Sequence, residues 1–409
     1  MQPSGLHLRL VVPGNVRHNS GGNVYNAALA RELTLQGVEV ETCPLDGDWP
    51  GGSPEDRRRL AAVLGTDGLH SDGLHPDGGS GASHRVTLVD GLLAGGAPEE
   101  LAAAAAAGRP AWILLHMPLE DPGLERRALR EAAGVICTSS SAAAGLRARH
   151  GLAGITVALP GTVSAPLASG SEPPHLLAMA ALLPNKDQSL LLDALSLLTE
   201  LPWTAALVGS DSADPAYAAQ LRDTVRRLGL QDRVSIPGEL RGGALEAEWA
   251  SADLSLLISR AETYGLVVPE SIARGVPVVV RAGTGAVEAL AAGTPQSRKP
   301  DTLPGAPAAG AGTLPGTAVA LAADPSPLAE ILHRWLTDTA LRTRWQSAAV
   351  AARNHLPGWD STARTVVEAL RAGSAGNPGS NPGTSQGSGP GSGPGEPPAD
   401  QPGGTAAGR

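Results

Sequence analysis

The sequence predicts an α/β protein built from two doubly wound domains, each a parallel sheet with helices on both faces. Short apolar strands alternate with helices twice along the 409 residues, and a Pro- and Gly-containing stretch around 161–174 separates the two series. This alternation is typical of parallel sheets, because each strand needs a crossover, usually a helix, before its parallel neighbour. The chain is also long enough for two ordinary domains.

The first series begins with a strand at Leu6–Val12, a glycine-containing loop at Pro13–Gly22 and a helix at about Asn23–Gln36. A strand, loop and helix in this order open a βαβ unit. Further strands are expected at Val38–Cys43, Val86–Val89, Trp112–Leu115, Val135–Thr138 and Thr156–Leu159. We therefore predict a first Rossmann-like domain over residues 1–165, with a low-complexity insertion at about 67–81.

The second series predicts a domain over residues 166–372. Its strands are expected at Leu176–Leu182, Thr204–Val208, Val234–Ile236, Leu254–Ile258 and Val276–Val280. A Pro/Gly/Ala-rich flexible insertion is predicted at about 295–316, and a final helix around Trp359–Arg371 could cross back to the first domain. Residues 373–409 are rich in Gly, Ser and Pro and are predicted to form a disordered tail.

The composition limits the possible partners and the cellular location. A net charge of -9 argues against nucleic acid as the main partner. The two cysteines, Cys43 and Cys137, show no metal-ligand spacing and are expected to be reduced thiols. No signal peptide and no run of about 18 apolar residues is found, so we expect a cytoplasmic protein without a transmembrane segment.

The segment from Ser259 to Val280 carries the clearest functional pattern. Glu262 and Glu270 are separated by seven residues, and a helix is predicted to begin between them near Gly265. A helix start offers free backbone amides to an anion, and carboxylates accept hydrogen bonds from sugar hydroxyls. The pattern therefore suggests a nucleotide-sugar site; the alternative is an ordinary surface helix with two solvated glutamates.

Other candidates follow predicted strands, and ligands of parallel sheets bind beyond the carboxyl ends of the strands. Lys186, one of only two lysines, is a compact charge suited to phosphate. Gly21 and Gly22 permit close approach of the backbone to a ligand. Gly209 follows another cleft-facing strand, and His116 could hydrogen-bond a ligand or pass a proton. A solvated lysine and a structural histidine are the alternatives for Lys186 and His116.

Together these motifs resemble the family-4 retaining glycosyltransferases of the two-domain GT-B type, and most closely the actinobacterial members of unassigned acceptor. The matching segments, in the family's order, are SGGNVYNAALARELTLQGVEV, LLHMPLE, ICTSS, ALPGT, LLPNKDQSLLLDAL, ALVGS and SRAETYGLVVPESIARGVPVV. They cover most of residues 5–370. The resemblance implies transfer of a sugar from a UDP-, GDP- or ADP-sugar to an acceptor, with retention of configuration and without a metal or other cofactor.

The resemblance also implies roles for the candidate residues. Lys186 would contact the diphosphate, Glu262 the hydroxyls of the transferred sugar and Glu270 the ribose. His116 would lie near the anomeric carbon and the acceptor, and we place it with Glu262 and Lys186 in the catalytic set. The remaining donor-binding positions, which include the amides expected at the distal phosphate, are Gly21, Gly22, Gly209, Tyr264, Gly265 and Leu266.

One position departs from the family pattern. Ala181 stands where the family usually has an arginine, which removes a positive charge from the expected diphosphate site. A degenerate module that binds a nucleotide sugar without catalysis, or a sugar-nucleotide epimerase of the same architecture, is therefore kept as an alternative. The sequence does not indicate the donor sugar, the nucleobase, the oligomeric state or the acceptor, which could be a glycan, a lipid-linked molecule or a small molecule.

A group of arginines in the first domain leaves a peripheral membrane contact open. A basic face for an anionic acceptor or a membrane surface is one interpretation of them, and an ordinary solvated helix face is the one we favour. These residues are Arg126, Arg127, Arg130, Arg147 and Arg149.

Overall fold

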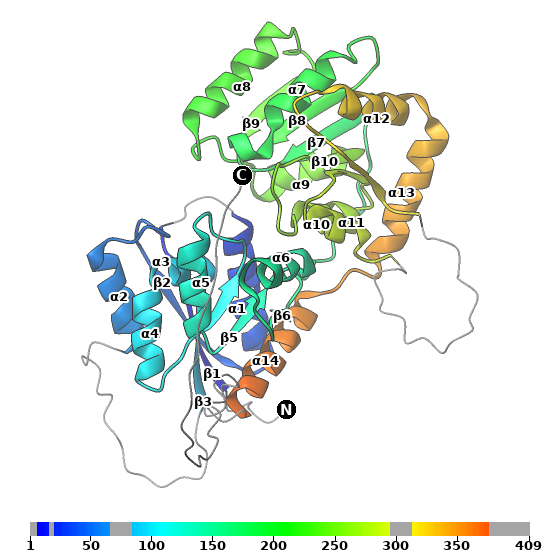
Figure 1. Cartoon of the computed structure of the whole chain (residues 1–409). Coiled ribbons are helices and arrows are strands. Elements are labelled where there is room, and N and C mark those ends of the chain that lie inside the picture. Colours follow the sequence, from blue (N-terminus) through cyan, green and yellow to red (C-terminus); the bar gives the residue numbers. More distant parts are fainter. Residues whose placement is uncertain (1–5, 16–19, 66–83, 295–312, 376–409) are drawn as a thin grey trace, which may run out of the picture.

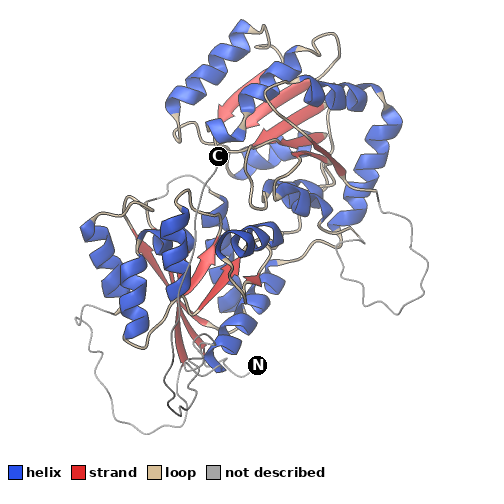
Figure 2. Cartoon of the chain, viewed as in Figure 1, coloured by secondary structure: helices blue, strands red, loops and turns tan. Residues whose placement is uncertain are grey.

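The computed structural model describes residues 6–15, 20–65, 84–294 and 313–375, which form two α/β domains (Figure 1). Each domain is built on a six-stranded sheet in which every described strand pair is parallel. Helices cover both faces of each sheet (Figure 2). The predicted fold class, an α/β chain of two doubly wound Rossmann-like domains, is confirmed.

The first sheet has the strand order β2-β1-β3-β4-β5-β6. Its strands are β1 (Leu6–Pro13), β2 (Glu39–Leu45), β3 (His84–Asp90), β4 (Trp112–Leu115), β5 (Gly134–Cys137) and β6 (Thr156–Val157). Its helices are α1 (Gly21–Leu35), α2 (Pro54–Leu64), α3 (Gly91–Gly96), α4 (Pro98–Ala106), α5 (Pro122–Glu131) and α6 (Ser140–His150). The order reverses between β1 and β3, which is where such sheets bind ligands.

The second sheet has the order β12-β11-β10-β7-β8-β9. Its strands are β7 (His175–Met179), β8 (Thr204–Val208), β9 (Val234–Gly238), β10 (Leu254–Leu257), β11 (Val278–Arg281) and β12 (Gly316–Val319). Its helices are the 3-10 turn η1 (Pro184–Lys186), α7 (Gln188–Ser196), α8 (Pro215–Arg227), α9 (Gly242–Ser251), α10 (Val267–Ala273), α11 (Ala286–Ala291), α12 (Ser326–Thr337) and α13 (Thr339–Arg353).

Separate apolar clusters fill the two faces of each sheet. In the first domain, α2 to α6 cover one face through residues such as Leu93 and Leu146, and α1 covers the other through Leu29 and Leu33. In the second domain, α7, α8, α12 and α13 pack on one face, and α9, α10 and α11 pack on the other. Burial on both faces explains why the strands are nearly continuous apolar runs.

The structure differs from the sequence prediction at two places that matter. Strand β12 was not predicted; it is only four residues long and follows the segment at 295–312, which lies outside the described residues. Helix α1 begins at Gly21, two residues earlier than expected, because the hydroxyl of Ser20 caps it by accepting the amide of Asn23. Gly21 and Gly22 therefore form the first turn of the helix and do not belong to the loop. The predicted insertion at 67–81 and most of the predicted tail also lie outside the described residues.

The last helix, α14 (Trp359–Ala375), packs against α1 of the first domain, although it follows the second domain in sequence (Figure 1). Its core residues include Val366 and Leu370, both fully buried. The chain thus crosses between the domains twice, and the two crossings touch: the Thr162 amide donates to the Pro357 carbonyl over 2.8 Å. The exact boundary between the domains stays a prediction.

Among the described helices, none is both long and apolar enough to span a membrane.

If α14 belongs to the core of the first domain, Leu370→Ala should lower the free energy of unfolding of that domain by about 2–5 kcal/mol, since it leaves a cavity. Urea denaturation followed by circular dichroism measures the change. Leu35→Ala is the matched control, because Leu35 also lies in a helix of this domain but is 71% exposed; it should change the free energy by less than about 0.5 kcal/mol. Equal effects of the two substitutions would contradict the packing of α14.

Candidate active site

The loop between β10 and α10 brings the two glutamates of the sequence motif to the carboxyl edge of the second sheet. Gly265 has a φ of +85°, and a Cβ there would lie 2.5 Å from Leu257 Cδ2, so the turn requires glycine. Within the described part of the chain, the amides of Gly265 and Leu266 donate no hydrogen bond. The side chain of Tyr264 packs in the core beneath the loop, where burial raises its pKa.

Lys186 and Glu262 form an ion pair at this edge. Lys186 Nζ donates to Glu262 Oε1 over 2.6 Å, and the two side chains are 21% and 14% exposed. Two residues predicted from segments 76 positions apart are therefore brought together. The ammonium group keeps two more N–H donors, and the carboxylate keeps a second oxygen, so both groups can still contact a ligand.

The position of Lys186 depends on its neighbour Asp187. Asp187 is buried and has a φ of +57°, the one non-glycine residue of the described chain with a positive φ. Its carboxylate pairs with Arg281, which is also buried, and with Arg260 over 2.9 Å. The Arg260 amide in turn donates to the Asn185 carbonyl over 2.8 Å. The turn that carries Lys186 is thus tied to the strand ends of β10 and β11.

Glu270 lies in the first turn of α10, and its carboxylate makes no hydrogen bond or ion pair within the described ranges. The guanidinium of Arg274 does not contact this carboxylate: it pairs with Glu246 over 3.1 Å, donates to the backbone carbonyl of Glu270 over 3.2 Å and lies 4.8 Å from the ring of Trp249. Burial raises the pKa of Glu270 to about 7; the charge of Arg274 opposes this rise and that of Glu246 adds to it. A carboxylate with unused hydrogen-bonding capacity suits a ligand hydroxyl.

Gly209 and Ala181 lie side by side at the ends of β8 and β7. A Cβ at Gly209 would overlap the carbonyl oxygen of Ala180, and the Gly209 amide donates to the Gly238 carbonyl over 3.0 Å. Close packing of two strand ends therefore explains this glycine. The Ala181 carbonyl accepts from Gln188 Nε2 over 3.0 Å.

The first domain contributes Gly21, Gly22 and His116. A methyl group built on Gly21 would lie 3.8 Å from Leu266 Cδ1 in the second domain, so the start of α1 approaches the β10–α10 loop across the boundary between the domains. A methyl group on Gly22 would lie 3.3 Å from Cδ2 of His116. Small residues at these two positions let α1 approach both the second domain and the histidine.

His116 belongs to a buried polar cluster that the sequence did not indicate. Its Nε2 lies 2.9 Å from Asn26 Oδ1 and 3.3 Å from Asp90 Oδ2, and Asn26 Nδ2 donates to Asp90 Oδ2 over 2.7 Å. The ring also meets Tyr25 edge-on at 5.1 Å. Burial would raise the pKa of Asp90, but His116, the Leu92 amide and Asn26 together hold it below its usual range.

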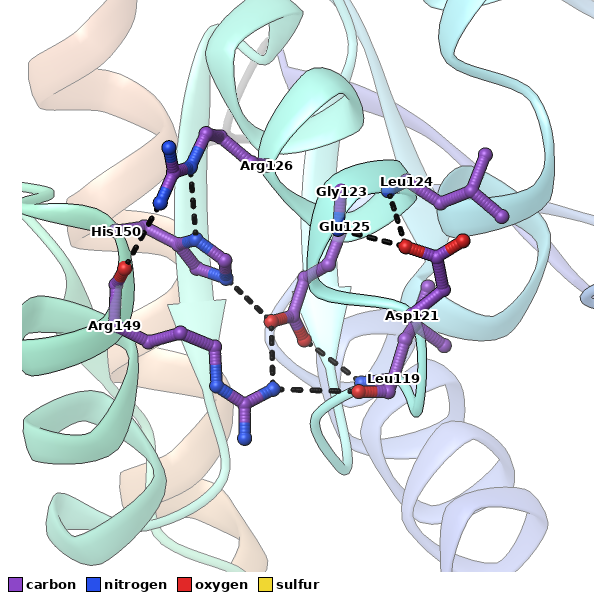
Figure 3. A network of polar contacts seen from close by, with 8 residues as sticks. All are labelled: Leu119, Asp121, Gly123, Leu124, Glu125, Arg126, Arg149 and His150. Atoms are coloured by element: carbon purple, nitrogen blue, oxygen red, sulfur yellow. Dashed lines mark hydrogen bonds and ion pairs between the residues drawn. The ribbon is translucent and has the colours of Figure 1, made fainter.

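A second network fixes the loop that follows His116 (Figure 3). Glu125, almost fully buried, accepts the Leu119 amide over 2.8 Å, His150 Nε2 over 2.5 Å and Arg149 over 3.1 Å. Arg149 also donates to the Leu119 carbonyl over 3.3 Å. The carboxylate of Asp121 caps the start of α5 by accepting the amides of Gly123 and Leu124.

The arginines that suggested a basic face are mostly engaged in such contacts. Arg126 donates to the Arg149 carbonyl over 3.3 Å, Arg127 pairs with Glu99 over 2.8 Å, and Arg147 donates to the Ile155 carbonyl over 3.2 Å. Together with Arg149, which contacts Glu125, four of the five arginine side chains are thus engaged in contacts within the protein.

One glutamate bridges the two domains. Glu288 of α11 accepts the Ser140 amide with both carboxylate oxygens, over 3.1 and 3.0 Å, and the Ser141 amide over 3.3 Å. These amides lie at the start of α6, where the helix dipole favours a negative charge. The contact joins the carboxyl edge of the first sheet to that of the second.

An Asp-Gly-Asp sequence, Asp46–Asp48, lies in the loop after β2 of the first domain. Across the residues that the structure describes, no group of three His, Cys, Asp or Glu side chains is placed to hold a metal ion.

Two Rossmann-like domains with ligand-facing strand ends toward one another define the GT-B fold. Solved structures of this fold cover most of the chain: a glycosyltransferase from Rickettsia africae matches 91% of it and 99% of its own length, with a TM-score of 0.65 and 14% identity. The HepE protein of Anabaena, solved with UDP and glucose, matches 90% of the chain and 99% of its own length, with a TM-score of 0.63 and 18% identity. These identities establish the fold alone.

The sequence comparisons point to a family. Residues 162–351 match the family described as "Glycosyl transferases group 1". A mannosylfructose-phosphate synthase of Agrobacterium fabrum is 35% identical over 130 residues, 30% of this chain and 29% of that protein. A D-inositol 3-phosphate glycosyltransferase of Kineococcus radiotolerans is 32% identical over 205 residues, 48% of this chain and 43% of that protein. The matches thus span less than half of the length of these relatives.

Four residues of the candidate site were not predicted from the sequence, because each makes its contacts with residues distant in sequence. They are Asn26, Asp90, Asp187 and Glu288. Only Asp90 carried a usable signal: it is the last residue of β3, His116 directly follows β4, and the ends of neighbouring parallel strands meet at one edge. Asn26 lies one helical turn after Gly22, so its side chain falls on the same face of α1.

Replacing Asp187 with asparagine should lower the free energy of unfolding by about 3 kcal/mol, because Arg281 then stays buried without a full counter-charge. Asparagine tolerates a positive φ, so backbone strain does not confuse the result. Chemical denaturation measures the change. Asp223→Asn is the control, since both side chains of the pair Asp223–Arg226 are 67% exposed. This substitution should lower the free energy of unfolding by less than about 1 kcal/mol. A loss at Asp187 no larger than at Asp223 would contradict a structural role for this pair.

Glu270→Gln should stabilise the ligand-free protein at alkaline pH. The folded pKa of about 7 exceeds the ordinary value of 4.5, so wild type loses stability as pH rises through this interval, whereas glutamine stays neutral. We expect a gain of about 1–3 kcal/mol near pH 8.5 and almost none near pH 4.5. Urea denaturation of both proteins at the two pH values measures it. A gain that does not depend on pH would show that Glu270 titrates normally.

Proposed function

We propose that this protein is a glycosyltransferase that moves a sugar from a nucleoside-diphosphate sugar to an acceptor, with retention of anomeric configuration and without a metal ion. The observation that carries the proposal is the edge of the second sheet. An ion pair of Lys186 and Glu262, two unused loop amides and the unpaired carboxylate of Glu270 lie there, on the β10–α10 loop, the first turn of α10 and the turn that carries Lys186. The ammonium group and the amides can bind a diphosphate, and the carboxylates can accept hydrogen bonds from hydroxyl groups.

In this proposal, Lys186 and the amides of Gly265 and Leu266 stabilise the charge that develops on the departing diphosphate. Fixed donors of this kind lower the barrier because they need no reorganisation when the charge appears. Glu262 and Glu270 orient the donor through hydroxyls of the transferred sugar and of the ribose. The bond from the anomeric carbon to the phosphate oxygen breaks, and a bond to the acceptor oxygen forms on the same face, while the departing phosphate helps to take the acceptor proton.

The first domain supplies the acceptor side. His116 and the start of α1 lie opposite the β10–α10 loop, and Glu288 holds the domains together. A donor enclosed between them would be shielded from water, and hydrolysis competes with transfer.

The site should bind a nucleotide sugar. A thermal-shift series with UDP-, GDP- and ADP-glucose should raise the unfolding midpoint by several degrees for at least one compound, since a ligand at about 100 times its Kd adds about 2.7 kcal/mol. Glu270→Ala and Lys186→Met should each remove most of this shift for the same compound, because each deletes a direct ligand contact. Glu368→Ala, on the first-domain helix α14, is the control that should leave the shift intact.

Absence of a shift with every nucleotide sugar would overturn the proposal. Once a donor is known, the anomeric configuration of the product, measured by proton NMR, decides retention, and activity in excess EDTA decides metal independence. Binding without transfer to any acceptor, or to water, would favour the non-catalytic alternative, to which Ala181 already points.

A further inference from the structure

The cluster around His116 fixes which ring nitrogen carries a proton. Asp90 is buried, and its carboxylate accepts the Leu92 amide over 2.9 Å and Asn26 Nδ2 over 2.7 Å. A carboxylate can only accept hydrogen bonds, so Asn26 must turn its NH₂ group toward Asp90. The Oδ1 atom of Asn26 is then the atom that faces His116 Nε2, 2.9 Å away.

Both neighbours of Nε2 are therefore acceptors. Asn26 Oδ1 has no proton to give, and Asp90 Oδ2, at 3.3 Å from the same nitrogen, is an ionised carboxylate. Nε2 must carry the proton, because the other tautomer would place its lone pair against two oxygen atoms. The neutral imidazole consequently has its lone pair on Nδ1.

The Nδ1 atom is open. The Cδ2 edge of the ring, on the opposite side from Nδ1, faces Gly22, and the side chain is 15% exposed. Among the residues described by the structure, Nδ1 has no hydrogen-bond partner, and it does not belong to the fully buried side-chain nitrogen and oxygen atoms that lack one. The same histidine directly follows β4, at the edge of the sheet that faces the second domain.

We propose that Asp90 and Asn26 act as a positioning pair that locks His116 in the Nε2–H tautomer and so presents Nδ1 as a hydrogen-bond acceptor for a hydroxyl group of the substrate. The substrate part rests on the proposed function, whereas the tautomer lock does not. Asp90 and Asn26 touch no ligand in this scheme; they act through the histidine. The chemistry recognised is a hydroxyl donor, as on a sugar or polyol.

The lock can be observed in the wild-type protein without substrate. We would label histidine with ¹⁵N and record the two- and three-bond ¹H–¹⁵N correlation spectrum above neutral pH, assigning His116 by its loss in His116→Gln. The expected result is a protonated, pyrrole-type Nε2 and a pyridine-type Nδ1 for that residue. A pyridine-type Nε2 in wild type would overturn the proposal regardless of any activity.

Asp90→Ser separates the lock from the other duty of Asp90, which is to cap α3. Serine is a good N-cap residue and can still accept the Leu92 amide, but it is too short to reach Asn26 or His116. The amide of Asn26 is then free to turn over, so we expect a mixture of tautomers at His116. Asp121→Ser is the matched control, because Asp121 caps α5 in the same way and has no contact with His116; the wild-type tautomer should persist there.

Measurements of transferase activity provide a second test of the proposal. Once transfer is measurable, Asp90→Ser should lower kcat/KM at least about tenfold, while Asp121→Ser should change it less than about twofold. Equal activity of Asp90→Ser and wild type, or an unchanged tautomer in Asp90→Ser, would overturn the proposal. Failure of all nucleotide sugars to bind would reject the proposed function instead, and the spectrum of the wild-type protein would still decide the lock.

Discussion

The buried ion pair between Asp187 and Arg281 holds together the edge of the second sheet on which the candidate site depends. Arg281 at the end of β11 also donates to the carbonyls of Ile258 and Leu321, each over 2.8 Å. One guanidinium group thus joins the turn after β7 that carries Asp187, the end of β10 and the segment after β12. Because a buried charge without its partner is costly, separating this pair is unfavourable, and the turn holds the adjacent Lys186 beside Glu262.

The fold was predictable because the pattern of apolar strands and interrupting helices is dictated by burial on both sheet faces. Local signals failed where the determinant was not local. Strand β12 has only the sequence GTAV to identify it, and it gains its identity by pairing with β11. The start of α1 shifted to Gly21 because a serine cap outweighed the poor helix propensity of two glycines.

The residues of the candidate site could be singled out where a motif carried them and not where tertiary contacts bring them together. Glu262, Glu270 and Lys186 stood out because their residue types suit a charged, hydroxyl-rich ligand. Nothing in the sequence could show that Lys186 and Glu262 neutralise each other in the ligand-free protein. Asn26 and Asp90 lie 64 positions apart, and each is an ordinary residue type in its own element. The strand end at Asp90 hinted at a position near His116, but the contact of Asp90 with Asn26 exists only in the folded cluster.

The pairing of Lys186 with Glu262 also bears on how a donor could be distinguished from its product. A free diphosphate competes with Glu262 for the ammonium group of Lys186. When the lysine turns to the diphosphate, the partly buried carboxylate of Glu262 loses a charged hydrogen bond worth about 1.5–3 kcal/mol. A nucleotide sugar, in the proposed function, offers a diphosphate to the lysine and hydroxyls to the glutamate at the same moment, so both groups exchange one partner for another. In the proposed function, the ion pair would therefore oppose a ligand that satisfies only one of its members, and it would favour the intact donor over the nucleotide that remains after transfer.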